Sequence, residues 1–136
     1  MALDLAAAFD SVKRKPLLKL LREKWGNSPF LDLYSKVLKN LKMEVNLGFK
    51  TVTGIQNLLG CPQGLKASCY AFTCALGEVM TRVQAKLPML SYQLYSDDIL
   101  LICESQAEIN EAISVIVHEL LEFGMKLEVS KTKIIR

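Results

Sequence analysis

Two adjacent carboxylates between two apolar, strand-like segments constrain the fold of this 136-residue chain more than any other feature. Asp97 and Asp98 separate the apolar segments 90–94 and 99–103. Because successive side chains of a strand point to opposite faces, both acids can approach one site only if they lie in a tight hairpin turn. Two like charges this close repel unless a cation neutralises them. The pattern therefore indicates either a hairpin that binds a hard cation such as Mg²⁺ or a solvated Asp-rich turn.

A third acid, Asp4, interrupts the apolar segment 3–9 near the start of the chain. An unpaired carboxylate is costly to bury, so Asp4 needs a partner or a metal ion if this segment is a buried strand. If that strand lies beside the hairpin of 95–103, Asp4 and Asp97 can share a two-metal site. Their long separation along the chain means that spacing alone does not establish this arrangement.

The composition supports a single globular domain, which we expect to span residues 1–136. Hydrophobic residues make up 51% of the chain and charged residues 23%, and this balance excludes an intrinsically disordered protein. No apolar run approaches the ~18 residues that a membrane span needs. The N-terminal segment has no basic region of the kind that begins a signal peptide. We therefore expect an intracellular protein, cytoplasmic or nuclear, with no membrane partner.

The charge distribution permits a polyanionic partner without requiring one. The net charge is +3, and basic residues gather in segments 13–24 and 131–136. These segments are either solvated surfaces or part of a nucleic-acid interface. The four cysteines include no C-x-x-C pair and the chain has a single histidine, so we expect buried free thiols rather than a zinc site or disulfides.

The spacing of apolar residues predicts a mixed order of helices and strands. Helices are expected from Pro16 to Gly26 and from Ser28 to Leu41, and two more at 67–86 and 107–123, the last capped by Gly124. Strands are expected at 1–7, 43–49, 51–59, 90–94 and 99–103, and two short ones around Leu127 and Ile134. Hairpins rather than regular βαβ units favour an α+β fold with helices on one face of an antiparallel sheet.

Four segments resemble, in the family's order, the sequence motifs of reverse transcriptases. Residues 3–12 (LDLAAAFDSV) resemble motif A, and residues 60–64 (GCPQG) resemble motif B. Residues 95–98 (YSDD) resemble motif C, and residues 124–127 (GMKL) with 130–133 (SKTK) resemble motif D. The chain is most similar to non-LTR (LINE-like) retrotransposon enzymes, with group II intron and retron enzymes as close competitors. The resemblance implies an α+β polymerase palm, a small antiparallel sheet packed on helices, without complete fingers or thumb.

This resemblance implies an RNA-directed DNA polymerase, which adds deoxynucleotides to a primer 3′-hydroxyl on an RNA template. It implies that Asp4, Asp97 and Asp98 are catalytic and bind two Mg²⁺ ions, for which Mn²⁺ can substitute. The Leu5 carbonyl would assist one of these ions. The expected partners are an RNA template, a DNA primer and deoxynucleoside triphosphates.

The resemblance also implies a set of substrate-binding residues. Phe9 would contact the sugar of the incoming nucleotide and exclude a 2′-hydroxyl. Gln63 would touch the nucleotide or the template, and Gly60 and Gly64 would let the backbone approach the substrate closely. Lys131 would protonate or neutralise the pyrophosphate. Without the resemblance, the simplest interpretation is that Phe9 is an ordinary core aromatic, that Gln63 belongs to a turn that binds no ligand, and that Lys131 is a surface lysine.

Because motif A begins at residue 4 and no thumb follows residue 136, we expect a palm-centred fragment of a longer polymerase. Its partners then include the fingers and thumb of that parent protein. The isolated fragment would be inactive or nearly so, since positioning supplies much of the rate of a transfer reaction. Two alternatives are an RNA-dependent RNA polymerase palm, which Phe9 disfavours, and a non-catalytic retroelement remnant that binds nucleic acid or protein.

Overall fold

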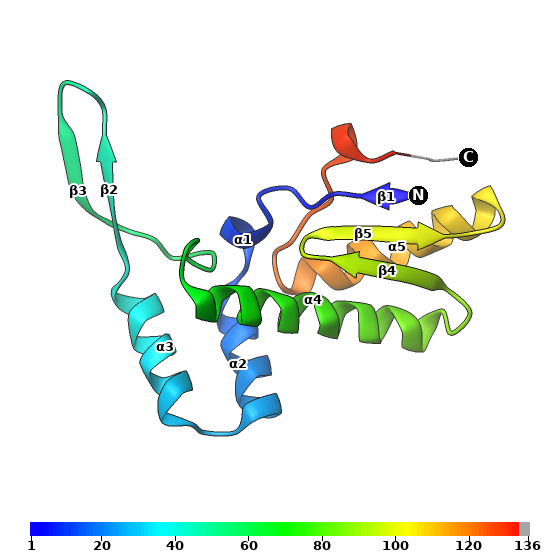
Figure 1. Ribbon diagram of the computed structural model, residues 1–136, viewed down its shortest axis with the longest axis horizontal. Coiled ribbons are helices and arrows are strands. Elements are labelled where there is room, and N and C mark those ends of the chain that lie inside the picture. Colours follow the sequence, from blue (N-terminus) through cyan, green and yellow to red (C-terminus); the bar gives the residue numbers. More distant parts are fainter. Residues whose placement is uncertain (134–136) are drawn as a thin grey trace.

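The N-terminal strand pairs with a hairpin at residues 91–102 in one antiparallel sheet in the computed structural model, which describes residues 1–133 (Figure 1). Its strands are β1 (Ala2–Leu3), β4 (Ser91–Tyr95) and β5 (Asp98–Ile102), in the order β1-β5-β4. Leu3 pairs with Ile99, and Tyr95 pairs with Asp98 across a two-residue turn. The predicted hairpin is therefore confirmed, and the first strand lies beside it, which is the condition under which Asp4 and Asp97 can share a site.

One face of this sheet is buried against two long helices, α4 (Lys66–Lys86) and α5 (Gln106–Glu122). Ile99 and Leu101 are buried on β5, while the residues that alternate with them are exposed or half-buried. The helices share the same hydrophobic core through side chains such as Phe72 and Ile116. Gly124, at φ 78°, follows the end of α5, and its amide donates to the Leu121 carbonyl, as the sequence predicts. The α+β class with helices on an antiparallel sheet is confirmed.

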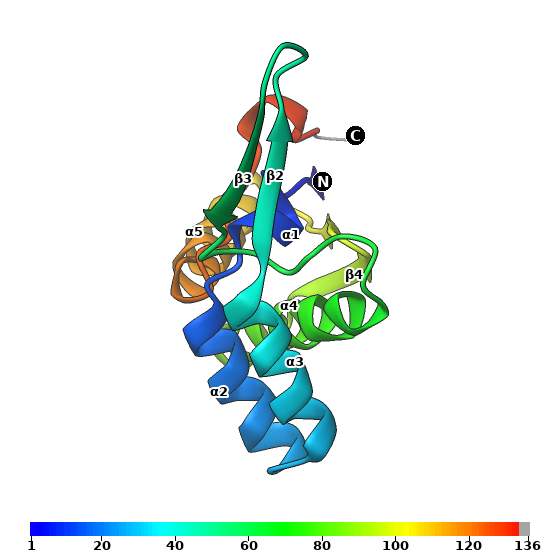
Figure 2. The same cartoon turned by 90° about the vertical axis from the view of Figure 1, so that its left-hand side faces the viewer.

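A second part of the molecule extends from this core (Figures 1 and 2). Helices α2 (Arg14–Trp25) and α3 (Pro29–Asn40) form an antiparallel pair, and Ser28 caps α3 by accepting a hydrogen bond from the Leu31 amide at 3.2 Å. Strands β2 (Lys42–Asn46) and β3 (Thr51–Gln56) form a separate two-stranded hairpin that projects away from the helices. The sequence predicts both the helices and this hairpin.

The chain termini differ from the prediction in two places. Strand β1 is shorter than the predicted strand at 1–7, because Ala7 takes a left-handed conformation (φ 46°) and starts the short helix α1 (Ala8–Ser11). Leu127 makes only an isolated bridge with Leu5, and a 3₁₀ turn, η1 (Val129–Lys131), follows it. The strand predicted around Ile134 lies outside the described residues.

Candidate active site

The sheet register places two of the predicted catalytic acids opposite one another. Ala2 pairs with Leu100 and Leu3 with Ile99, so the next position, Asp4, stands opposite Asp98. Leu3 and Ile99 are buried, and alternation along an extended chain therefore puts Asp4 and Asp98 on the open face of the sheet. The two acids are far apart in the sequence, and the pairing of β1 with β5 brings them together.

The third acid lies in the turn between β4 and β5. Ser96 and Asp97 form this turn, and Ser96 has a φ of 55°, which is unusual for a residue other than glycine. Asp97 is half-buried, whereas Tyr95 beside it is 83% exposed. The turn therefore holds the Asp97 carboxylate at the end of the sheet where Asp4 and Asp98 stand.

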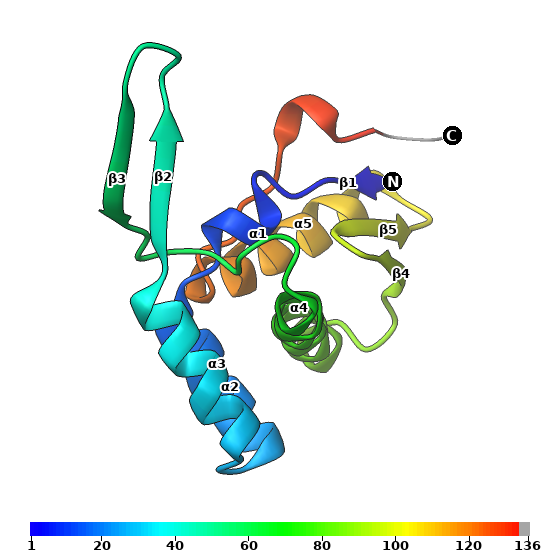
Figure 3. The same cartoon turned by 60° about the vertical axis from the view of Figure 1, so that its left-hand side comes forward.

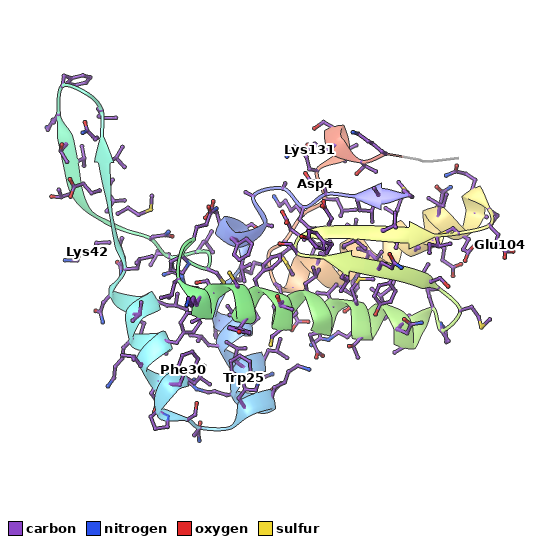
Figure 4. All side chains as sticks on the ribbon, viewed as in Figure 1. Asp4, Trp25, Phe30, Lys42, Glu104 and Lys131 are labelled. Carbon is purple, nitrogen blue, oxygen red and sulfur yellow. The ribbon has the colours of Figure 1, made fainter. Side chains whose placement is uncertain are left out.

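A lysine from the C-terminal segment supplies the positive charge at this site (Figure 4). Lys131 Nζ lies 3.1 Å from Asp4 Oδ2. The Asp4 carboxylate raises the pKa of Lys131 above its usual range, and Glu128 and Asp97 act in the same direction from farther away. The resemblance predicts Lys131 to be a substrate-binding residue. In the structure it is influenced electrostatically by two of the predicted catalytic acids, Asp4 and Asp97.

The donor chemistry of the site fits a hard divalent cation, although no complete ligand cage is formed. Among residues 1–133, no group of three or more His, Cys, Asp or Glu side chains lies close enough together to hold a metal ion. Asp4 Oδ2 is nevertheless buried, and its charge partner among the described residues is the Lys131 ammonium. Mg²⁺ commonly binds through one or two carboxylates and completes its shell with water and substrate phosphates.

The segment after Asp4 is fixed by the C-terminal chain. The Asp4 carbonyl accepts a hydrogen bond from the Glu128 amide at 2.8 Å, and the Ala6 amide donates to the Lys126 carbonyl at 2.8 Å. The Leu5 carbonyl accepts neither of these two hydrogen bonds, and the Leu5 side chain is buried. The predicted motif A and motif D segments are therefore joined through their backbones.

Three predicted substrate-binding residues line one small cavity. It has a volume of about 250 Å³ and is formed by residues of α1, of the loop before α4 and of the first turn of α4: Phe9, Pro62, Gln63, Gly64, Ser68 and Cys69. Phe9 stacks on the buried Phe72, with ring centroids 4.4 Å apart, and its exposed part faces the cavity. Phe9 is thus a partly buried core aromatic and a cavity wall at once.

The glycines of the predicted motif B segment have two different roles. Gly60 packs on α1: a Cβ at Gly60 would lie 2.8 Å from the Asp10 Cα, and its amide donates to the Val12 carbonyl at 2.8 Å. The close approach that the structure shows at Gly60 is to the protein's own backbone, and an approach of this glycine to substrate stays a prediction. Gly64, at φ 84°, has open space around it and lines the cavity. Gln63 Nε2 donates to Asp10 Oδ2 at 3.4 Å.

Sequence reasoning missed Arg14. Its hydrogen bonds fix the loop at 57–60, which directly precedes the residues that line the small cavity. Its guanidinium donates to four backbone carbonyls: from Nε to Gly60 (2.8 Å), from Nη1 to Leu38 (2.6 Å) and Asn57, and from Nη2 to Leu59 (2.7 Å). Burial lowers the pKa of Arg14 from its usual range. In the sequence Arg14 is one of a run of basic residues, and nothing in that run distinguishes it.

Sequence reasoning also missed Cys69 and Ser68, which lie in the first turn of α4. All four cysteines are free, as predicted, but Cys69 is exposed and lines the cavity, which contradicts the expectation that every thiol is buried. Burial raises the pKa of the Cys61 thiol. Ser68 is 1% exposed and its hydroxyl has no hydrogen-bond partner among the described residues, so the cavity wall carries an unpaired polar group.

The fold agrees with the comparison to known families. Among residues 1–133, no helix is long and apolar enough to cross a membrane. No curated protein matches the sequence closely enough to count as a relative. The family model described as reverse transcriptase (RNA-dependent DNA polymerase) matches residues 1–136. That match covers the whole sequence, including the segments that carry Asp4, Gln63 and Asp97, and the chain therefore belongs to the reverse transcriptase family.

Proposed function

We propose that residues 1–136 act as one domain, the palm of a reverse transcriptase that extends a DNA primer on an RNA template. The observation that carries this proposal is the register of β1 on β5, which sets Asp4 opposite Asp98 beside the Asp97 turn. The family match supports the same chemistry. We further propose a non-LTR retrotransposon parent that acts inside the cell, in the cytoplasm or the nucleus, and supplies fingers and thumb.

Asp4, Asp97 and Asp98 would hold two Mg²⁺ ions, with the Leu5 carbonyl as a further oxygen ligand. Bound there, the ions would favour deprotonation of the primer 3′-hydroxyl and stabilise the leaving pyrophosphate. The chain's own residues orient the reactants around this centre. Asp4 is held by its backbone bond to Glu128, and Lys131 supplies a positive charge and a proton next to the carboxylates.

The small cavity is the proposed subsite for the incoming deoxynucleotide. Phe9 would lie against its sugar, and the stacking of Phe9 on Phe72 gives that ring little freedom to move aside. Gln63 and the open backbone at Gly64 would contact the nucleotide or the template base. Because the Phe9 ring cannot move aside, it would exclude the 2′-hydroxyl of a ribonucleotide by steric contact. This subsite therefore favours DNA synthesis over RNA synthesis.

The metal assignment is tested by measuring the affinity of the 136-residue chain for Mn²⁺. The relaxation rate of water protons reports the binding. We expect Asp4→Asn to weaken Mn²⁺ binding by about tenfold, because a charged ligand becomes neutral. We expect Lys131→Met to strengthen it, since Asp4 then loses its competing ammonium. A matched Lys133→Met variant should bind as the unaltered chain does. Equal affinity in the Asp4→Asn variant and the unaltered chain would remove Asp4 from the metal site.

The sugar contact is tested by Phe9→Val in a longer version of the chain that includes the segments encoded on either side of it. We expect the preference for deoxynucleotides over ribonucleotides to fall by about tenfold or more, which corresponds to about 1.4 kcal/mol of lost discrimination. The measurement is the ratio of kcat/KM for the two nucleotides. Phe72→Leu changes the residue on which Phe9 stacks but leaves Phe9 itself in place. It should therefore lower the preference for deoxynucleotides less than Phe9→Val does. An unchanged ratio in Phe9→Val would exclude Phe9 from the subsite.

A further inference from the structure

A second and much larger cavity is lined by residues of helix α2, which Figure 3 shows beside α3 and away from the strands β4 and β5. Its volume is about 1280 Å³. Its walls come from α2, from the second half of α3, from the loop after β3 and from Glu122 at the end of α5. None of the acids of the candidate active site lines it, so it is a separate surface feature.

Cationic side chains on one face of α2 border this cavity. Lys15, Lys19 and Arg22 are spaced at i, i+4 and i+7, so they form a stripe about 10 Å long on the helix. All three are exposed, and Lys39 of α3 adds a further cation on the opposite wall.

Little of this positive charge is neutralised within the described residues. Two acids line the cavity, Glu23 and Glu122. Glu23 makes a long, exposed ion pair with Lys19 at 3.8 Å, which contributes little. Glu122 forms an ion pair with Arg82 of α4. The stripe is therefore free to meet an acidic partner.

The floor of the cavity is apolar. Leu18 and Pro16 are half-buried between the cations, and the loop after β3 presents Leu58 and Leu59, which are 70% and 50% exposed. No aromatic side chain among the described residues lines the cavity. Single-stranded nucleic acid is usually held by aromatic stacking in addition to cations, so this surface lacks one of its two usual elements.

We propose that this groove, formed by the cationic stripe of α2 and the apolar floor at Leu18, Leu58 and Leu59, binds an acidic amphipathic helix of another polypeptide. An apolar stripe on such a helix would cover the leucines, and acids beside that stripe would face Lys15, Lys19 and Arg22. A helix lying in a hydrophobic groove is a common mode of recognition, and the charges on the rim fix its orientation. This interaction does not depend on the polymerase function.

The test uses the 136-residue chain and a fluorescein-labelled synthetic helix of three heptads, with leucine at the a and d positions and glutamate at e and g. Binding is followed by fluorescence anisotropy, and a scrambled peptide of the same composition is the control. We expect the triple variant Lys15→Gln, Lys19→Gln, Arg22→Gln to bind about tenfold more weakly, given that each exposed ion pair contributes little alone. The matched variant Lys36→Gln, Lys42→Gln, Lys50→Gln removes three exposed charges elsewhere and should bind normally.

A second variant, Leu58→Gln, tests the apolar floor at a side chain too exposed to matter for folding. It should weaken peptide binding at least threefold and leave the circular dichroism spectrum unchanged. Three results would overturn the proposal: equal binding of the scrambled peptide, unaltered binding by the α2 triple variant, or displacement of the peptide by a 20-nucleotide oligo(U). The last of these would assign the groove to nucleic acid.

Discussion

Replacing Asp97 with Asn should lower Mg²⁺-dependent DNA synthesis at least about a thousandfold, equivalent to about 4 kcal/mol of transition-state stabilisation. In the proposed mechanism this carboxylate neutralises a metal ion at the reacting phosphate, and an amide of the same size cannot supply that charge. The measurement is the rate of single-nucleotide addition to a DNA primer on an RNA template. It requires the version of the chain that includes the segments encoded on either side.

A control on α3 separates loss of chemistry from loss of fold. Asp32→Asn makes the same change at an exposed carboxylate in the first turn of α3, outside the cavity and the sheet. Its rate should stay within about twofold of the unaltered protein, because a charge near a helix N-terminus contributes only a fraction of a kcal/mol to stability. A rate in Asp97→Asn that is also within about twofold would exclude Asp97 as a metal ligand.

Replacing Arg14 with Met should destabilise the 136-residue chain by about 3 kcal/mol, the largest stability effect that we expect from one polar residue. Four backbone carbonyls accept from this guanidinium, and they belong to α3 and to the loop at 57–60. Without the guanidinium these partly buried acceptors lose their donors. Arg14→Lys should be only partly better, since one ammonium cannot reproduce the planar fork. Urea unfolding measures both.

The loop at 57–61 gives this prediction a local readout. The Cys61 thiol is buried behind the carbonyls that Arg14 holds, and burial raises its pKa. It should therefore react slowly with a thiol reagent in the unaltered chain and faster in Arg14→Met. Lys36→Met, on the exposed side of α3, is the matched control and should change neither quantity. A loss below about 1 kcal/mol with Cys61 still protected would contradict the role of Arg14.

Much of the fold could be predicted because local signals and tertiary packing agree. Ser28 followed by Pro29 marks the start of α3, and Gly124 marks the end of α5, since each supplies a cap that the helix end requires. The hairpin at Asp97 follows from two apolar segments with polar residues between them. The approach of Asp4 to this hairpin is different, because it depends on a strand pairing across most of the chain. Only the resemblance to a family predicted it.

The remaining features of the site have no local signal. Arg14 and Lys15 are adjacent basic residues, yet one is bound to four carbonyls and the other is exposed in the groove. Cys61 is likewise buried in the loop before α4, whereas Cys69 is exposed in the first turn of that helix. The ion pair of Lys131 with Asp4 depends on the backbone bridge between Leu127 and Leu5. A predicted strand around Leu127 does not by itself indicate that Leu5 is its partner.

The most direct test of the account is primer extension on an RNA template with Mg²⁺. It compares the 136-residue chain with the version extended by the segments encoded on either side. We predict deoxynucleotide addition by the extended protein, loss of that addition on chelation of the metal, and little or none from the 136-residue chain. No addition by a folded extended protein, with Mg²⁺ or with Mn²⁺, would contradict the assignment of Asp4, Asp97 and Asp98 as a polymerase centre. It would favour a non-catalytic member of the family.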